Sequence, residues 1–486
     1  MECLFIDRWC HMCGIFGMYG PPNAAELTLL GLYALQHRGD EGAGIAAGDG
    51  EELRYYKGLG LVSEVFSDGS IIEGLKGHLA IGHNRYSTTG ASIPVNTQPL
   101  VANCRGGPIA IAHNGNLVNV TSLKQQLTNA GALFQTTMDS EIIVHLIARS
   151  QEETLSHRLI DALIQVQGSY ALLIASKDSI IAARDPLGFK PLCLGDLKGA
   201  WVVASESRAL DIVGASYIRD IEPGEILEIN PEGLTSLRLP GAASDEEQLS
   251  LQEKPVAEPP KTAFCVFEYI YFSMPDSRIF GDYVDKTRRR LGRQLALEQP
   301  VDADIVISVP DSSNTAALGY SQTSGIRFEI GLIRNHYIGR TFISPDQKDR
   351  NLKARVKYNT VGGVLKGKRV VVVEDSIVRG TTMRQLVHML REAGATEVHV
   401  RVSSPPIRYP CFYGIDFQTR KELIAASMTV DQIKEHLGVD SLGYLSIEGM
   451  LQSVPNSTKS YCTACFSGHY PTPIENGTGK DALEQK

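Results

Sequence analysis

Two acidic residues and several hydroxyl side chains lie together in one loop whose residue types could bind phosphate and a divalent cation. Glu374 and Asp375 follow four consecutive valines, and small polar residues come directly afterwards: Ser376, Thr381 and Thr382. Residues 383–390 have apolar side chains at helical spacing, so we expect the loop to lie at a helix N-terminus. Such a position offers free backbone N–H groups to a phosphate, and carboxylates are hard ligands for Mg²⁺. The pattern therefore predicts a phosphate and magnesium site.

Four of the nine cysteines have a spacing and surroundings that favour a metal site. Cys462 and Cys465 form a C-x2-C pair, while Cys265 and Cys411 lie upstream in aromatic segments. The spacing permits either a zinc ion held by four cysteines or an iron–sulfur cluster. Because we expect the protein in the reducing cytoplasm, free thiols and metal ligands explain the cysteines better than a disulfide framework.

Cys13 could act as a nucleophile, although a lone cysteine before a glycine at a strand start is more often a buried structural thiol. Four polar segments follow it that combine histidine, arginine, asparagine and aspartate: residues 37–39, 82–88, 113–116 and 139–141. A thiolate can attack a carbonyl carbon when a base removes its proton and nearby donors hold the oxyanion. These segments contain residue types suited to both tasks.

Two kinds of secondary-structure pattern must position these groups. From residue 13 to about 238, short apolar runs alternate with turn residues and predict strands, while residues 26–35 and 140–149 have helical spacing. Residues 240–261 are acidic and rich in proline, which predicts a linker. Beyond it, residues 305–309 and 369–373 are β-branched runs followed by a loop and a helix, typical of a parallel α/β sheet.

Composition excludes several classes of protein. The net charge is −8 without a basic block, which argues against nucleic-acid binding. No apolar run reaches the roughly 18 residues that would span a membrane, and residues 1–12 carry charges where a signal peptide needs an apolar stretch. We therefore expect a cytoplasmic protein that acts on small molecules.

The polar segments around Cys13 resemble those of the class II glutamine amidotransferases over residues 13–239. The resemblance implies an α+β N-terminal-nucleophile glutaminase domain of four layers, αββα, in which Cys13 is the nucleophile and its own α-amine is the base. It further implies that Asn114 and Gly115 stabilise the oxyanion. It assigns glutamine binding to three residues: Arg85, Asp139 and Arg38.

An α-amine can serve as the base only if residues 1–12 are absent from the mature chain, because a peptide nitrogen cannot accept the proton. Met12 directly precedes Cys13, so it could be the true start and be removed by methionine excision. Alternatively, residues 1–12 are a self-cleaved propeptide. Both routes leave Cys13 at the N-terminus.

The loop after the valines resembles the phosphoribosyl pyrophosphate (PRPP) signature of the type I phosphoribosyltransferases, which implies an α/β domain over residues 262–470. The resemblance assigns PRPP binding to Glu374, Asp375, Ser376, Ile377, Val378, Arg379, Gly380, Thr381 and Thr382. Ser312 matches a second loop and would hold one Mg²⁺ per subunit with Glu374 and Asp375. The basic segment 334–357 resembles a loop that closes over PRPP. Residues 471–486 are expected to form a flexible tail.

Both halves together resemble the amidophosphoribosyltransferase family, one branch of which carries a [4Fe-4S] cluster on cysteines matching Cys265, Cys411, Cys462 and Cys465. The resemblance implies one cluster per subunit, transfer of ammonia from glutamine to PRPP at the start of purine synthesis, inhibition by purine nucleotides, and a homotetramer. One alternative is another glutamine amidotransferase, which would lack the PRPP loop. A second is a PRPP-sensing regulator, which would need a DNA-binding element.

Overall fold

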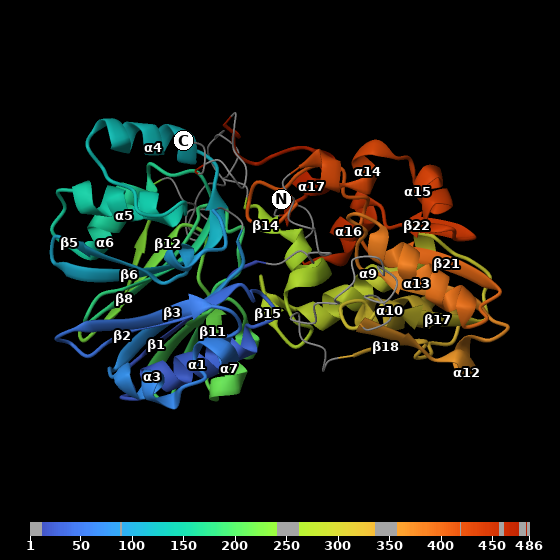
Figure 1. Cartoon of the computed structure of the whole chain (residues 1–486), viewed down its shortest axis with the longest axis horizontal. Helices are drawn as coiled ribbons and strands as arrows, with labels where there is room; N and C mark the ends of the chain where they lie inside the picture. Colours follow the sequence, from blue (N-terminus) through green and yellow to red (C-terminus); the bar gives the residue numbers. More distant parts are fainter. Residues whose placement is uncertain are drawn as a thin grey trace, which may run out of the picture.

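A computed structural model describes residues 12–87, 90–240, 262–335, 357–417, 419–455, 461–475 and 483 of the chain. Residues 12–240 form the N-terminal half and residues 262–475 the C-terminal half (Figure 1). Residues 1–11 of the expected leader, all but residue 240 of the expected linker, and most of the expected basic loop lie outside the described residues.

Two antiparallel sheets pack face to face in the N-terminal half. The first has the order β11-β9-β10-β1-β4-β2-β3 and consists of β1 (Gly14–Tyr19), β2 (Gly42–Gly48), β3 (Leu53–Leu59), β4 (Leu79–Arg85), β9 (Cys193–Leu197), β10 (Ala200–Ala204) and β11 (Ser216–Asp220). The second has the order β13-β12-β8-β7-β6-β5 and consists of β5 (Leu100–Cys104), β6 (Gly107–Leu117), β7 (Gly168–Ala175), β8 (Ile180–Arg184), β12 (Glu225–Asn230) and β13 (Gly233–Arg238).

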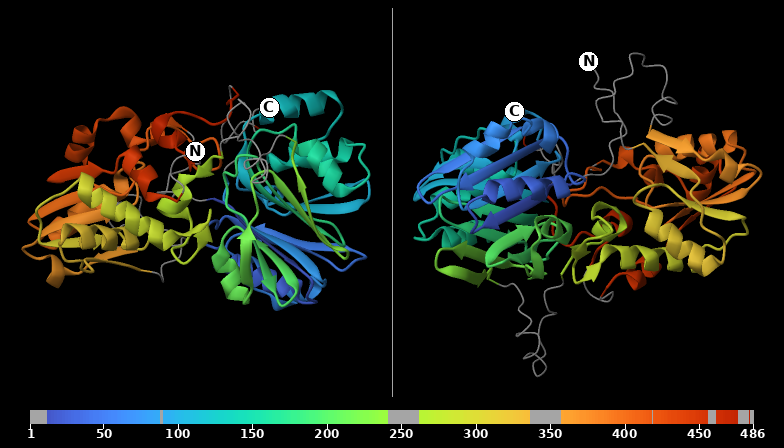
Figure 2. Two further views of the ribbon diagram at one scale, coloured as in Figure 1. Left: turned by 180° about the vertical axis from the view of Figure 1, so that it is seen from behind. Right: turned by 90° about the horizontal axis from the view of Figure 1, so that it is seen from below.

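Helices cover the outer face of each sheet. The seven-stranded sheet is covered by α1 (Ala24–Ala34), α2 (Val62–Val65), α3 (Gly69–Gly74) and α7 (Ser207–Val213). The six-stranded sheet is covered by α4 (Val120–Asn129), α5 (Ser140–Arg149) and α6 (Leu155–Leu163). Both helices predicted from apolar spacing are present, as α1 and α5. The arrangement confirms the predicted four-layer αββα fold (Figure 2).

The C-terminal half is built on a parallel sheet in the order β17-β20-β21-β22, formed by β17 (Ile305–Ser308), β20 (Arg369–Glu374), β21 (Glu397–Val402) and β22 (Ser441–Tyr444). One face packs against α9 (Val284–Glu298), α10 (Asn314–Ser324) and α16 (Ile447–Ser453). The other face packs against α12 (Gly362–Leu365), α13 (Thr381–Glu392), α14 (Ile424–Ser427) and α15 (Val430–Leu437). The predicted α/β domain is therefore confirmed.

Short elements complete the chain. They are β14 (Phe264–Cys265), β15 (Arg278–Ile279), β16 (Asp282–Tyr283), β18 (Leu332–Arg334), β19 (Tyr358–Thr360), β23 (Tyr461–Cys462), α17 (Ala464–Ser467), the π-helix η2 (Glu268–Phe272) and the 3-10 helices η1 (Pro94–Asn96) and η3 (Arg420–Glu422). Among the described helices, none is long and apolar enough to cross a membrane.

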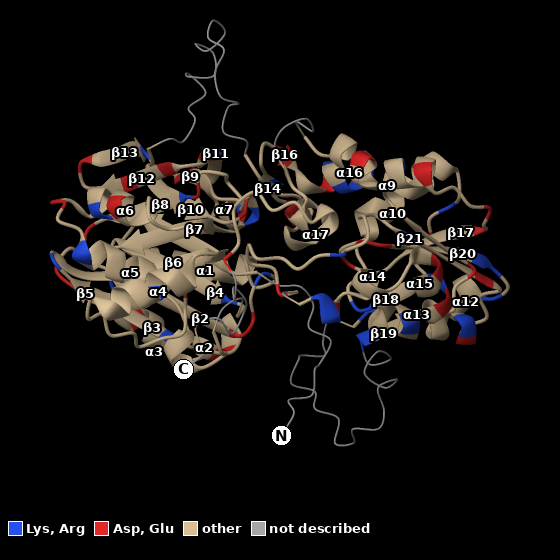
Figure 3. Cartoon of the chain, turned by 90° about the horizontal axis from the view of Figure 1, so that it is seen from above, with Lys and Arg blue, Asp and Glu red and all other residues tan. Residues whose placement is uncertain are grey.

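One aromatic core joins the two halves. Phe189, on the loop after β8, stacks on Tyr413 with ring centroids 4.2 Å apart, and Met12 belongs to the same core. The backbone N–H groups of Ala263 and Cys265 donate to carbonyl groups of this loop, at 2.7 and 3.0 Å. Seen from above, β14 and α17 lie between the two halves (Figure 3). The junction therefore brings the segment around Cys13 close to the C-terminal half.

The described part of the expected flexible tail contacts both halves, beginning with Thr472, whose N–H donates to the Tyr413 hydroxyl at 3.1 Å. Ser122 of α4 donates a 2.5 Å hydrogen bond to the Glu475 carboxylate. Leu483 is buried in the core beneath α4 and α5, and Lys124 donates to its carbonyl oxygen at 2.9 Å. These residues do not behave as a loose tail, because an apolar side chain and a carboxylate both find partners there.

Candidate active sites

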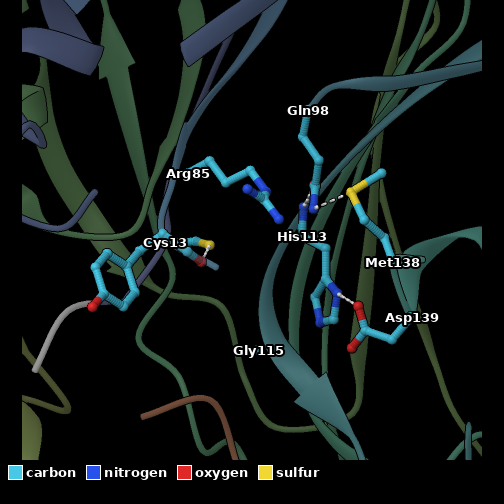
Figure 4. Close-up of a pocket in the computed structure, with 8 residues that line it drawn as sticks. Cys13, Arg85, Gln98, His113, Gly115, Met138 and Asp139 are labelled. Atoms are coloured by element: carbon cyan, nitrogen blue, oxygen red, sulfur yellow. Dashed lines mark hydrogen bonds and ion pairs between the residues drawn. The ribbon is translucent and has the colours of Figure 1, made fainter. Parts of the chain in front are cut away.

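Cys13 lies directly before β1 and is 6% exposed. It borders a pocket lined by Cys13, Arg85, Tyr86, Gln98, His113, Gly115, Met138 and Asp139 (Figure 4). The pocket residues come from β4, from β6 and from the segment that leads into α5, so the two facing sheets and their loops build it together. Four residues predicted from the resemblance thus lie around one cavity: Cys13, Arg85, Gly115 and Asp139.

The Cys13 thiol is buried, and Met12 is attached to its backbone nitrogen. Burial raises the pKa of this thiol to about 11, against the attraction of the Arg85 guanidinium. The nitrogen of Cys13 is part of a peptide bond here, so it offers no base. Met12 is fully buried, and its N–H donates to the Arg38 carbonyl oxygen at 3.0 Å. The thiol therefore needs a base that the chain with Met12 attached does not provide.

Arg85 and Asp139 provide opposite charges in the pocket. The Arg85 guanidinium donates to the carbonyl oxygens of Gly90 and Ala91 at 3.3 and 3.1 Å, and burial lowers its pKa. Burial would raise the pKa of Asp139, but His113 and backbone N–H groups outweigh burial and keep this pKa below its ordinary value. A pocket with one cation and one anion suits a small zwitterion.

Asn114 lies in the strand β6 between His113 and Gly115, which both line the cavity. The amide nitrogen of Asn114 is buried and has no hydrogen-bond partner among the described residues. A buried donor without a partner is costly, so its presence between two pocket-lining residues points to a ligand oxygen. At position 115, a side chain could not fit, because a Cβ atom would lie 2.1 Å from the carbonyl oxygen of Ser169.

Arg38 lies outside the pocket, in contrast to the expectation that it binds glutamine. It is 1% exposed, and its Nε donates to the Cys13 carbonyl oxygen at 2.9 Å. Its remaining donors bind two buried carboxylates, Glu206 at 2.6 Å and Glu268 at 2.7 Å. Since these acceptors occupy the guanidinium, Arg38 holds the backbone of Cys13 and, through Glu268, links it to the C-terminal half.

Gln98 and His113 line the pocket but were not predicted as site residues. The Gln98 side-chain oxygen accepts from the His113 backbone N–H at 2.7 Å, and its nitrogen donates to Ser140 at 3.3 Å. His113 Nδ1 lies 3.5 Å from an Asp139 oxygen. Gln98 thus contacts His113 and Ser140, which both lie beside the Asp139 carboxylate. His113 stands beside Asn114 in the sequence and could have been chosen, whereas nothing in the spacing marks Gln98.

Glu374 and Asp375 end β20 at the second predicted site. Ser312 donates to an Asp375 oxygen at 2.5 Å, Ser376 donates to the other oxygen at 2.6 Å, and Ser313 donates to Glu374 at 3.0 Å. Helix α13 begins at Thr381, directly after this loop. The structure therefore brings together two loops that are far apart in the sequence, since 63 positions separate Ser312 from Asp375.

The two acids form a buried like-charged pair. Burial, together with the Asp375 charge, raises the pKa of Glu374 well above its usual value, and burial also raises the pKa of Asp375. The Arg288 guanidinium, whose charge opposes the rise at Asp375, is itself occupied by the backbone carbonyls of Tyr269 and Ser273. A divalent cation would relieve the repulsion, and the donors present are the oxygen ligands that Mg²⁺ takes.

The four predicted cysteines converge at the junction of the halves. Cys265 of β14 lies opposite Cys462 of the neighbouring parallel strand β23. Cys411 and Cys465 lie in the same aromatic core. Burial raises the pKa of all four thiols, and for Cys462 and Cys465 the charges of the other sulfurs add to this rise. In the described part of the chain, no group of three or more His, Cys, Asp or Glu side chains is arranged to hold a single metal ion. The donor set is all sulfur, which suits a zinc ion or an iron–sulfur group.

Comparison with protein families and curated proteins agrees with both halves. A family model described as a glutamine amidotransferase domain matches residues 83–212. The amidophosphoribosyltransferase of Bacillus subtilis is 50% identical over 96% of this chain and 95% of its own. That of Methanocaldococcus jannaschii is 48% identical over 95% of this chain and 98% of its own.

Solved structures match over nearly the whole chain. A structure described as the allosteric regulatory enzyme of purine biosynthesis superposes with a TM-score of 0.89 at 49% identity, covering 98% of this chain and 99% of the other. A glutamine PRPP amidotransferase from B. subtilis, complexed with ADP and GMP, gives 0.88 at 49% identity, covering 97% of this chain and 100% of the other. The chain belongs to the amidophosphoribosyltransferase family of glutamine-dependent pentosyltransferases.

Proposed function

We propose that Cys13 is the glutaminase nucleophile of this enzyme and that its own α-amine is the base. With an ordinary pKa of about 7.7 to 8.0, a free α-amine is partly neutral near neutral pH and can take the thiol proton. The thiolate then attacks the amide carbon of glutamine, and the protonated α-amine gives its proton to the amide nitrogen, which leaves as ammonia. Water hydrolyses the thioester that remains on Cys13 and releases glutamate. The observation that carries this proposal is the pocket that brings Cys13, Arg85, Gly115 and Asp139 together, with the buried, unpartnered amide nitrogen of Asn114 next to Gly115 in β6.

Binding of glutamine follows from the charges around the cavity. Arg85 would bind the α-carboxylate of glutamine, since a guanidinium offers a bidentate fork to a carboxylate. Asp139, held by the Leu117 backbone N–H and by His113, would bind the α-ammonium group. Asn114 and the backbone N–H of Gly115 would then donate to the oxyanion, where each donor contributes roughly 10² to 10³ in rate.

At the second site, PRPP would bind along residues 374–382. The hydroxyl groups and backbone N–H groups of the loop before α13 suit the 5′-phosphate, and the acids Glu374 and Asp375 suit the ribose hydroxyls. One Mg²⁺ per subunit would be held by Ser312, Glu374 and Asp375, and it would supply charge neutralisation for the pyrophosphate that leaves. Ammonia from the glutaminase pocket would attack C1 of the ribose and give 5-phosphoribosylamine and pyrophosphate.

We also propose one [4Fe-4S] cluster per subunit on Cys265, Cys411, Cys462 and Cys465. The four buried thiols come from separate segments, so a shared ligand would tie the C-terminal segment to the core. The sulfurs of Cys265, Cys411 and Cys462 all interact electrostatically with that of Cys465, which supports one group shared by the four cysteines. Zinc is the alternative with the same donor set.

Regulation and assembly are the remaining parts of the proposal. A relative of known structure was complexed with ADP and GMP, and another is described as an allosteric regulatory enzyme. We therefore propose that purine nucleotides inhibit this chain. A homotetramer in the cytoplasm, acting in the first committed step of purine synthesis, completes the proposal.

The test is a coupled assay on anaerobically purified protein, together with mass spectrometry of the N-terminus. We expect glutamate and pyrophosphate in equal amounts, both dependent on PRPP and Mg²⁺, from chains that begin at Cys13. Chains that begin at Cys13 but release glutamate without pyrophosphate would contradict the proposal. Iron and sulfide in equal amounts would support the cluster, and zinc in their place would contradict it.

A further inference from the structure

Lys190 is a fully buried lysine that the proposed reaction does not use. It lies on the loop after β8, and the neighbouring Phe189 of this loop packs in the aromatic core of the junction. Its ammonium group has one hydrogen-bond partner among the described residues, the Met12 thioether sulfur at 3.4 Å. A thioether is a weak acceptor, so this buried cation lacks the anionic partner that buried charges normally require.

The surroundings of Lys190 contain the four cysteines. The preceding residue, Phe189, accepts the backbone N–H of Cys265 at 3.0 Å and stacks on Tyr413, two positions after Cys411. The Lys190 ammonium interacts electrostatically with three of the sulfurs, those of Cys265, Cys411 and Cys462. Lys190 therefore faces a group of sulfurs that would carry negative charge once they bind metal.

Removal of the leader would change the surroundings of the Lys190 ammonium. When Cys13 becomes the first residue, the Met12 sulfur leaves, and with it the one hydrogen-bond acceptor of the ammonium among the described residues. Glu268, the buried acid nearest along the chain to Cys265, is already occupied by Arg38 and by Ser273 at 2.7 Å. An anionic cysteine group would then balance the buried positive charge.

We propose that Lys190 is the internal counter-cation of the cysteine-bound cluster, contributed by the N-terminal half. The inference rests on the proposed [4Fe-4S] group, whose core and four thiolates together have a net negative charge. A cation beside it stabilises the thiolate ligands and favours the reduced over the oxidised cluster. Lys190 is thus a positioning and charge-balancing residue that connects the cluster to the loop behind Cys13.

The experiment compares Lys190→Met, which keeps the length of the side chain but removes the charge, with Lys190→Arg, which keeps the charge. The readouts are iron and sulfide content, the rate of iron loss to a chelator, and the reduction potential of the anaerobic protein. We expect Lys190→Met to lose iron about tenfold faster and to have a more negative potential. Lys190→Arg is expected to stay close to the unaltered protein.

A matched control is Lys57→Met, which removes a part-buried lysine whose ammonium donates to the Thr97 carbonyl oxygen, away from the cysteines. It should leave all three readouts unchanged. If Lys190→Met does not fold, Lys190→Gln provides a second neutral variant for the same comparison. Circular dichroism establishes the fold of each variant before the iron measurements.

The outcomes separate this inference from the proposal on which it rests. Equal iron loss and equal potential in Lys190→Met and the unaltered protein would overturn the inference and leave the cluster in place. Equal impairment in Lys190→Met and Lys190→Arg would assign the effect to packing and would also overturn it. If the unaltered protein contains no iron and sulfide, the cluster proposal itself fails, and the inference fails with it.

Discussion

The pocket around Cys13 carries opposite charges, whereas the loop edge at Glu374 and Asp375 carries like charges. Arg85 and Asp139 each have protein partners before any ligand arrives, and the pKa of Asp139 stays below its ordinary value. The two acids at the second site instead have raised pKa values because they are buried together. The difference indicates that the first site has its charges paired in advance, while the proposed Mg²⁺ would relieve the repulsion between the two acids of the second.

The largest expected effect separates the two sites. Cys13→Ala should lower glutamine-dependent activity by about 10⁴-fold or more, because it removes the nucleophile. Activity with ammonium as the nitrogen source should remain, since no residue of the second site changes. Pyrophosphate release measured with each nitrogen source tests this. Cys193→Ala, a buried cysteine outside the pocket, is the control and should change neither rate.

The next effect concerns the ion pairs that join the halves behind Cys13. Arg38→Met should lower the free energy of unfolding by about 3 to 5 kcal/mol, because it leaves Glu268 buried without this cation and Glu206 with His37 alone. Urea titration followed by circular dichroism measures the change. Arg208→Ala removes a pair with the exposed Asp276 and should cost no more than about 1 kcal/mol. Similar losses in the two variants would mean that the buried network does not stabilise the junction.

Asn114→Ala tests the preorganisation of the first site. Glutaminase turnover should fall by roughly 10² to 10³, since one oxyanion donor is lost. The Michaelis constant for glutamine should change little, because Arg85 and Asp139 remain. Steady-state kinetics with glutamine and with ammonium provide both numbers. A rise in the Michaelis constant without a fall in turnover would assign Asn114 to ground-state binding.

The smallest effect is a dependence of stability on pH. Although burial would raise the pKa of Glu206, His37 and Arg38 hold it well below its ordinary value. Glu206 therefore contributes stability above its unfolded pKa of about 4.3, and this contribution disappears as the pH falls through the folded pKa. Melting temperatures between neutral and acidic pH should fall less steeply in Arg38→Met. Parallel curves for the two proteins would contradict the assignment.

The sequence predicted the parts of both sites that depend on local patterns. The strand, loop and helix at residues 369–390 and the helix at residues 140–149 follow from valine runs and apolar spacing, and both are present. Gln98 and the partners of Arg38 could not be predicted, since these contacts join distant segments. Glu268 lies 230 positions from Arg38, and no periodicity carries information over that separation. Leu483 was missed for the same reason.

The central claim is that one chain joins a glutaminase to a phosphoribosyl transfer site. The most direct measurement supplies glutamine labelled with ¹⁵N at the amide, together with PRPP, Mg²⁺ and an excess of unlabelled ammonium. We predict that the 5-phosphoribosylamine carries the label well above its dilution in solution, with glutamate and pyrophosphate formed in equal amounts. Label diluted to the level of free ammonium would contradict internal transfer, and glutamate without labelled product would contradict the claim itself.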